Sequence, residues 1–64
     1  MLPVNQVFRM GELRKRLLWS GTEQAIWIDI DSDTALPEPI SVAELERLLM
    51  ERELESIADP FEET

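Results

Sequence analysis

The sequence predicts an α+β domain in which one α-helix closes a small, twisted antiparallel sheet of three to four strands. Ile26–Ile30 alternates apolar side chains with others, as a strand does, and leads into an acidic turn. From Ser41 onwards, apolar residues recur at the spacing of a helix. A chain of 64 residues forms a single domain, near the lower limit at which a core supports a fold unaided.

Three strands are expected in the first half, joined by short turns. They comprise residues 4–8, 13–19 and 24–30, and both connections between them contain a glycine. Connections this short favour antiparallel neighbours, so the three strands should form a meander. Pro37 and Pro39 prevent a regular central strand in the segment that follows, which we expect to be a loop or a short edge segment.

A capping box predicts where the helix begins. The Ser41 hydroxyl can accept a hydrogen bond from the Glu44 amide, and the Glu44 carboxylate can reach back to the Ser41 amide. The helix should run from about residue 42 to about residue 52. Its apolar stripe consists of Val42, Leu45, Leu48 and Leu49. Leu54 and Ile57 should then return to the sheet as a last short strand.

Composition limits both the extent of the domain and its chemistry. We expect residues 1–58 to form the domain and residues 59–64 to be an acidic tail or the start of a linker. The chain has no cysteine and no histidine, which excludes disulfides, thiolate metal sites and the commonest general base. It shows neither a signal peptide nor an apolar run near the ~20 residues that span a bilayer. We expect a soluble, cytoplasmic domain with no cofactor, small-molecule substrate or membrane partner.

The charge is divided unevenly along the chain, whose net charge is −8. Residues 1–28 hold four basic and two acidic residues (+2), whereas residues 29–64 hold two basic and twelve acidic residues (−10). An acidic protein repels the phosphates of nucleic acids, so DNA binding by the whole domain is disfavoured. Contact through one basic edge stays open.

That edge is what we call the basic cluster: Arg9, Arg14, Lys15 and Arg16. Arg14 and Arg16 should share one face of a strand with Lys15 on the other, while Arg9 lies across the predicted hairpin. The cluster is a candidate phosphate-contact site. The alternative is that it pairs with the acidic half of the chain or protects an exposed sheet edge.

The acidic turn offers no metal site. Asp29, Asp31 and Asp33 have the spacing that opens a calcium loop, but Thr34 and Ile40 stand where that loop needs glycine and a bidentate glutamate. Alternating residues also project in different directions, which disfavours two-metal chemistry. A glycosidase-like carboxylate pair would need a cleft. We interpret these acids as a solvated strand end that binds turn amides, and assign no catalytic or metal-binding residue.

The two tryptophans, Trp19 and Trp27, are expected to supply much of the core. Trp27 nevertheless lies on the strand face opposite Ile26 and Ile28. If the helix covers the isoleucine face, Trp27 is left partly exposed beside Ala25, and an exposed tryptophan can anchor a partner. Ala25 and Trp27 are therefore the candidate protein-contact residues.

The order of these elements resembles the N-terminal domain of TnsB-like transposases, the DDE integrase-type recombinases of heteromeric bacterial transposons. The segments that carry the resemblance are Val4–Phe8, Arg16-Leu17-Leu18, Ile26–Ile30, Ala35-Leu36-Pro37, Glu53-Leu54-Glu55 and Asp59-Pro60-Phe61. The resemblance implies a longer parent protein in which helix-turn-helix domains and an RNase H-like catalytic domain follow. The family's catalytic acids lie in that later domain, so none is transferred here. The basic stretch 13–16 departs from the family pattern.

We expect an SH3-like or partly barrelled sheet and a noncatalytic accessory domain. It would assist assembly of the transposition complex through contacts with other transposition subunits or other domains of the same transposase. Transposon-end DNA would be bound through the parent protein. Ala25 and Trp27 are the first expected contact surface and the acidic helix face is the second. The alternatives are a DNA-contacting module that uses the basic cluster, or an unrelated small acidic binding protein.

Overall fold

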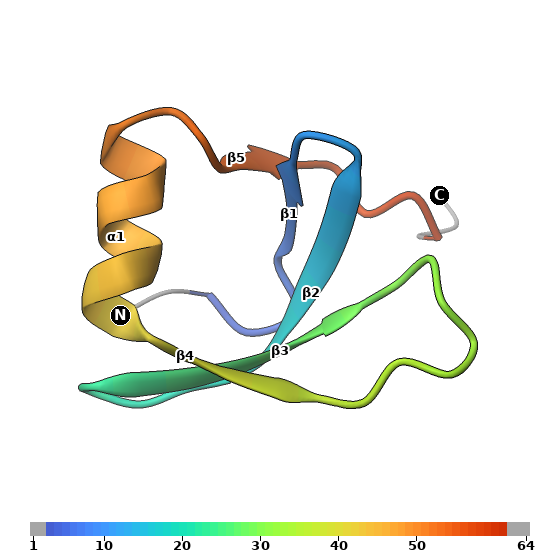
Figure 1. Ribbon diagram of the computed structural model, residues 1–64, viewed down its shortest axis with the longest axis horizontal. Coiled ribbons are helices and arrows are strands. Elements are labelled where there is room, and N and C mark those ends of the chain that lie inside the picture. Colours follow the sequence, from blue (N-terminus) through green and yellow to red (C-terminus); the bar gives the residue numbers. More distant parts are fainter. Residues whose placement is uncertain (1–2, 62–64) are drawn as a thin grey trace.

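A computed structural model describes residues 3–61 and confirms the predicted α+β architecture. Five antiparallel strands form one sheet in the order β4-β3-β2-β1-β5, and a single helix connects the two edge strands (Figure 1). The elements are β1 (Val7–Met10), β2 (Leu13–Ser20), β3 (Gln24–Asp29), β4 (Glu38–Ser41), α1 (Val42–Met50) and β5 (Glu55–Ile57).

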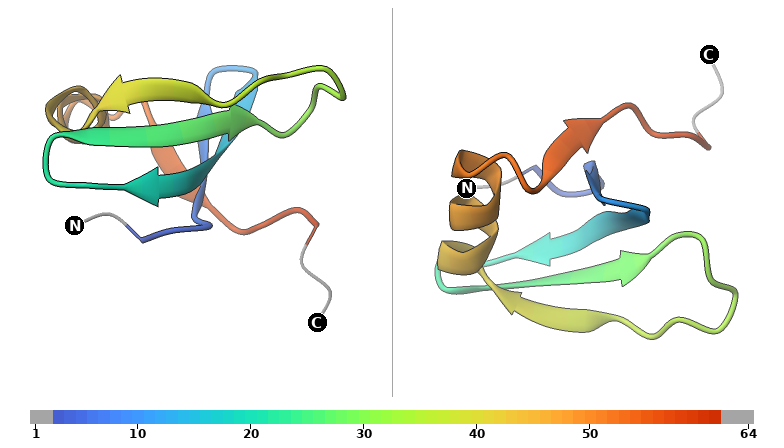
Figure 2. Two further views of the ribbon diagram at one scale, coloured as in Figure 1. Left: turned by 90° about the horizontal axis from the view of Figure 1, so that it is seen from below. Right: turned by 45° about the horizontal axis from the view of Figure 1, so that its top comes forward.

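The sheet is curled, and α1 lies at one end of it (Figure 2). The core is enclosed between them and includes side chains from the sheet, the helix and the connection after the helix. Its members are Phe8, Leu17, Ala25, Trp27, Val42, Leu45, Leu48 and Leu54. We call the sheet face that carries this core the inner face, and the opposite one the outer face.

The first strand begins later than predicted because the backbone turns at Asn5. Asn5 has φ +72°, a left-handed conformation that asparagine tolerates better than most residues. The preceding segment still pairs with β2, since the Asn5 amide donates to the Leu17 carbonyl at 2.7 Å and the Leu17 amide donates to the Gln6 carbonyl at 2.9 Å. The meander of β1, β2 and β3 is otherwise as predicted.

The segment with two prolines forms the predicted short edge. In β4, Ile40 pairs with Ala25 and Pro39 pairs with Ile26. A proline has no amide hydrogen to donate, so this strand pairs on one side and lies at the edge of the sheet. The last short strand is also confirmed, since Ile57 pairs with Val7 at the other edge.

The helix begins as predicted and ends two residues early. The Ser41 hydroxyl accepts a hydrogen bond from the Glu44 amide at 3.0 Å, but the Glu44 carboxylate accepts from the Arg47 guanidinium instead of the Ser41 amide. Only half of the predicted capping box therefore forms. Arg52 adopts φ +62°, and the Glu53 amide donates back to the Leu48 carbonyl at 3.0 Å. This left-handed residue, at the position predicted to be the last of the helix, ends the helix before it.

The helix covers the Trp27 face of β3, so the condition under which Trp27 would be partly exposed is not met. Ala25 and Trp27 lie in the same buried cluster as the helix residues, whereas Ile26 and Ile28 are half-buried on the outer face. A tryptophan removes more apolar surface from water than an isoleucine does, and a neighbouring alanine leaves room for a helix. This combination favours the Trp27 face for the core.

The expectation that Trp19 supplies the core is wrong, because 51 % of its surface is exposed. The register of β2 against β3 shifts at a bulge: Leu17 pairs with Trp27, but Trp19 pairs with Ile26. The extra residue, Leu18, turns the following side chain to the outer face. In the described residues, no helix is long and apolar enough to cross a membrane.

Candidate functional site

The two candidate protein-contact residues, Ala25 and Trp27, are buried. Ala25 is fully buried and Trp27 is 5 % exposed. The partial exposure on which their selection rested is therefore absent. In the folded domain these side chains belong to the core cluster, and protein contact through them stays a prediction.

The Lys15 ammonium lies over the ring of Trp27. It lies 5.1 Å from the centroid of the indole ring and 3.3 Å from a carboxylate oxygen of Glu38. Only 11 % of the Lys15 side chain is exposed. The cation is thus held between an aromatic face and a carboxylate, on the inner face of the sheet, while Arg14 and Arg16 point to the outer face.

Arg14 is held at the start of β2 by the acidic turn. Its Nε–H donates to one oxygen of Asp31 at 2.9 Å, and a second guanidinium N–H donates to the other oxygen. This two-point pairing lowers the pKa of the Asp31 carboxyl and raises the pKa of Arg14. The pair fixes the turn after β3 against β2.

Arg16 makes the corresponding contact with the C-terminal segment. Its two terminal nitrogens donate to the two oxygens of Asp59 at 2.7 and 2.9 Å. These bonds, together with one from the Phe61 amide, lower the pKa of the Asp59 carboxyl. Asp59 therefore binds the sheet. The predicted division at residue 58 stays a prediction, and residues 62–64 of the expected tail lie outside the described part of the chain.

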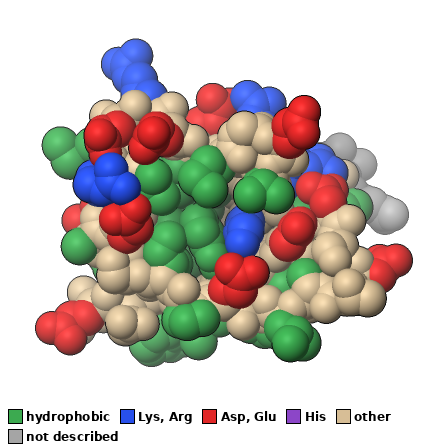
Figure 3. All heavy atoms as spheres, viewed as in Figure 1, with side chains coloured by type: hydrophobic (Ala, Val, Ile, Leu, Met, Phe, Trp, Pro, Cys, Tyr) green, Lys and Arg blue, Asp and Glu red, His purple; other side chains and the backbone are tan. Residues whose placement is uncertain are grey.

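Arg9 pairs with Glu55, its direct neighbour across β1 and β5. Each member of the basic cluster thus has a carboxylate partner within residues 3–61. This agrees with the alternative that the cluster pairs with the acidic half of the chain. Basic and acidic side chains also lie side by side on the face shown in Figure 3. A phosphate would have to displace these carboxylates. Phosphate contact by the cluster stays a prediction.

Carboxylates of the acidic turn accept hydrogen bonds from the turn's own backbone and from Arg14. Asp29 accepts a hydrogen bond from the Asp31 amide at 2.9 Å, which confirms the interpretation that these acids bind turn amides. Within residues 3–61 there is no group of three acidic side chains arranged to hold a metal ion.

The acidic helix face is partly neutralised by its own arginine. Arg47 lies between Glu44 and Glu51 and forms ion pairs with both. The pairing lowers the pKa of the Glu44 carboxyl. Glu46 and Glu53 are exposed and take part in none of the ion pairs of the described chain.

A hollow of about 400 Å³ lies between the N-terminal and C-terminal segments. It is lined by Val4, Asn5, Gln6, Val7, Ile57, Ala58 and Asp59. The Gln6 side-chain amide donates hydrogen bonds to the Val7 and Ile57 carbonyls, and Asp59 is paired with Arg16. The lining offers no nucleophile beside a base, so its polar groups act in structure.

The feature that sequence reasoning missed is a partly exposed apolar row on the outer face. Trp19, Ile26 and Pro39 are successive cross-strand neighbours on β2, β3 and β4, and we call them the outer row. A signal was present: Leu17, Leu18 and Trp19 are three consecutive apolar residues in a strand. An alternating strand with one buried face cannot bury all three.

Comparison with known proteins gives one family. No curated protein matches the chain. A family model described as the TnsB N-terminal SH3-like domain matches residues 1–60. The match covers nearly the whole chain, agrees with the curled sheet and single helix, and confirms the resemblance seen in the sequence. The chain belongs to the family of TnsB N-terminal SH3-like domains.

Proposed function

We propose that this domain assists assembly of a transposition complex through protein–protein contacts. The family is a noncatalytic N-terminal domain of a transposase and not its DDE catalytic domain. Its partners would be other transposition subunits or other domains of the same transposase. Transposon-end DNA would be bound by the parent protein.

The observation that carries this proposal is the distribution of unpaired charge. The basic cluster is paired with carboxylates, whereas further acidic side chains are exposed and outside the ion pairs of residues 3–61. These acids are Glu12, Glu23, Asp33, Glu46 and Glu53. The surface therefore presents net negative charge, which attracts a basic protein and repels a phosphate backbone.

The test compares the transposase with a variant that lacks this domain. We expect the complete transposase and the variant without the domain to bind a transposon-end duplex with the same affinity in a gel-shift assay. Assembly of the larger complex with the other subunits should be weaker without the domain. Unchanged assembly would refute the proposal.

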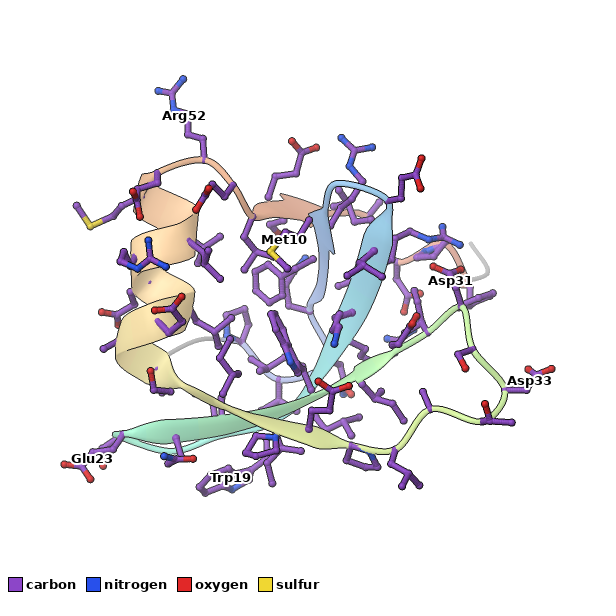
Figure 4. The ribbon with its side chains drawn as sticks, in the orientation of Figure 1. Met10, Trp19, Glu23, Asp31, Asp33 and Arg52 are labelled. Atoms are coloured by element: carbon purple, nitrogen blue, oxygen red, sulfur yellow. The ribbon has the colours of Figure 1, made fainter. Side chains whose placement is uncertain are left out.

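A second comparison separates protein contact from DNA contact. Arg14→Gln and Arg16→Gln remove charge from the basic cluster, and Arg52→Gln removes the same charge from an arginine that projects from the far end of the helix (Figure 4). We expect the three variants to bind the transposon-end duplex with the same dependence on salt. A loss of salt-sensitive binding in the first two alone would transfer the function to the basic cluster.

A further inference from the structure

The outer row is an apolar surface that crosses three strands. Trp19 pairs with Ile26, and Ile26 pairs with Pro39, so the three side chains lie next to one another on one face. Figure 4 shows Trp19 beyond β3 and β4, on the side away from the helix and from Met10. The core therefore does not use these side chains.

The Trp19 ring packs closely against a glycine. A Cβ atom at Gly21 would lie 2.6 Å from the Cη2 atom of Trp19 and 3.1 Å from its Cζ2 atom. Real Cβ contacts are not that short, so the ring packs on the glycine backbone in a position that a side chain would block. Trp19 is 51 % exposed, and its ring rests against the glycine backbone. A large, partly exposed aromatic side chain is a favourable anchor for a partner.

Further apolar side chains adjoin the outer row along the chain. Ile28 is half-buried on the outer face of β3, Leu18 is exposed in β2, and Pro37 is exposed just before β4. Leu18 contributes at the bulge, where 38 % of its surface is exposed. Such a contiguous apolar area on a small domain is typical of an interaction surface.

The unpaired charge beside the outer row is acidic. Glu23 lies in the turn between β2 and β3, at the end of the sheet near Trp19 (Figure 4). It is exposed and takes part in none of the ion pairs of residues 3–61. Arg14 and Arg16, the basic residues that face outward from β2, are paired with Asp31 and Asp59. A ligand of the outer row would therefore meet an apolar surface with negative charge at its border.

We propose that the outer row binds an apolar, positively charged segment of a partner protein, with Trp19 as the anchor. The proposal rests on the proposed function and names the surface that performs it. Charge complementarity favours one kind of occupant: a second copy of the chain would bring another net −8, and a nucleic acid would bring phosphates close to Glu23. A basic, apolar segment is stabilised both by burial of its apolar side chains on the outer row and by attraction to the negative charge.

The first test uses the transposase and three changes. Deletion of the domain, Trp19→Ala and Met50→Ala are compared for assembly with the other subunits. Met50 is the matched control, because it is 84 % exposed and lies on α1 rather than on the sheet. We expect Trp19→Ala to reproduce the effect of the deletion and Met50→Ala to behave as the unchanged protein.

The outcomes of this test separate the two proposals. If the deletion weakens assembly and Trp19→Ala does not, the outer row is not the contact and the proposed function stands. If the deletion itself has no effect, the proposed function fails. Circular dichroism of each variant domain confirms that loss of assembly is not loss of fold.

The second test identifies the occupant by NMR titration of the labelled domain. The probes are overlapping synthetic peptides from the other subunits and from the rest of the transposase, and a transposon-end duplex. We expect basic apolar peptides to shift the Trp19 indole and the outer face of β3, with affinity about tenfold or more lower in Trp19→Ala. Binding elsewhere on the domain, binding of the duplex at Trp19, or self-association through Trp19 would each overturn the proposal.

Gly21→Ala provides a variant that leaves the tryptophan present. Gly21 does not have a positive φ, so its backbone accepts alanine, but the new methyl group must displace the Trp19 ring. We expect weaker peptide binding with an unchanged circular dichroism spectrum. The NMR spectrum shows whether the Trp19 ring has moved in this variant. If the ring has moved and peptide affinity equals that of the wild type, the indole in its present position is not the anchor.

Discussion

Replacing Trp27 with alanine is expected to remove most of the folding stability of this domain. Trp27 is 5 % exposed and lies in one cluster with residues of three strands and the helix. Truncation of a buried tryptophan costs about 3–5 kcal/mol, because apolar contacts are lost and a cavity is left. Loss of the contact with the Lys15 ammonium adds about 0.5–1 kcal/mol.

The total stability available is of the same order. At roughly 0.05–0.15 kcal/mol per residue, a 64-residue domain has a free energy of unfolding of roughly 3–10 kcal/mol. If the stability lies in the lower half of this range, Trp27→Ala leaves little or none of it. Trp19→Ala is the natural control, because Trp19 is 51 % exposed and its removal leaves no cavity in the core. We expect a cost of about 1–2 kcal/mol for that change.

Urea and thermal denaturation, followed by far-ultraviolet circular dichroism, measure both variants without relying on tryptophan fluorescence. In a domain of this size, 1 kcal/mol corresponds to about 4–8 °C in Tm. Trp27→Ala should therefore lower Tm by at least about 12 °C or show no folded baseline. Equal losses in the two variants, or a loss below about 1 kcal/mol at Trp27, would refute the assignment of the two faces.

Two further predictions concern the helix and the ion pairs. Ser41→Ala should lower the free energy of unfolding by about 1 kcal/mol, because the Glu44 amide loses its acceptor, whereas Ser56→Ala in β5 should change it little; urea denaturation measures both. The pKa of Asp59 is lower in the folded state than in the unfolded state, so its stabilising contribution is present above the unfolded value near 3.8 and is lost as the pH falls through the folded value. Urea denaturation from pH 7 to pH 2.5 should therefore show a loss of stability in acid that is smaller in Arg16→Gln; equal slopes would contradict the role of this pair.

The sequence by itself determined the local elements and their order. The alternation in β3, the serine cap at residue 41 and the prolines before it act over a few neighbouring residues. Such local preferences do not require knowledge of the rest of the chain, so the strands, the edge segment and the helix start were predicted from them. The acidic net charge, which underlies the proposed function, is also a property of composition alone.

The tertiary structure alone decided which side chains are available. A bulge at Leu18 changes the register of one strand, and this places Trp19 outside and leaves Trp27 inside. Side chains alternate with period two, so a single extra residue exchanges faces, and no local pattern fixes where that residue falls. Likewise, Arg16 finds its carboxylate 43 residues away at Asp59. Charge pairing over such distances depends on how the sheet curls, so the pairing of the basic cluster was one of two alternatives until the fold was known.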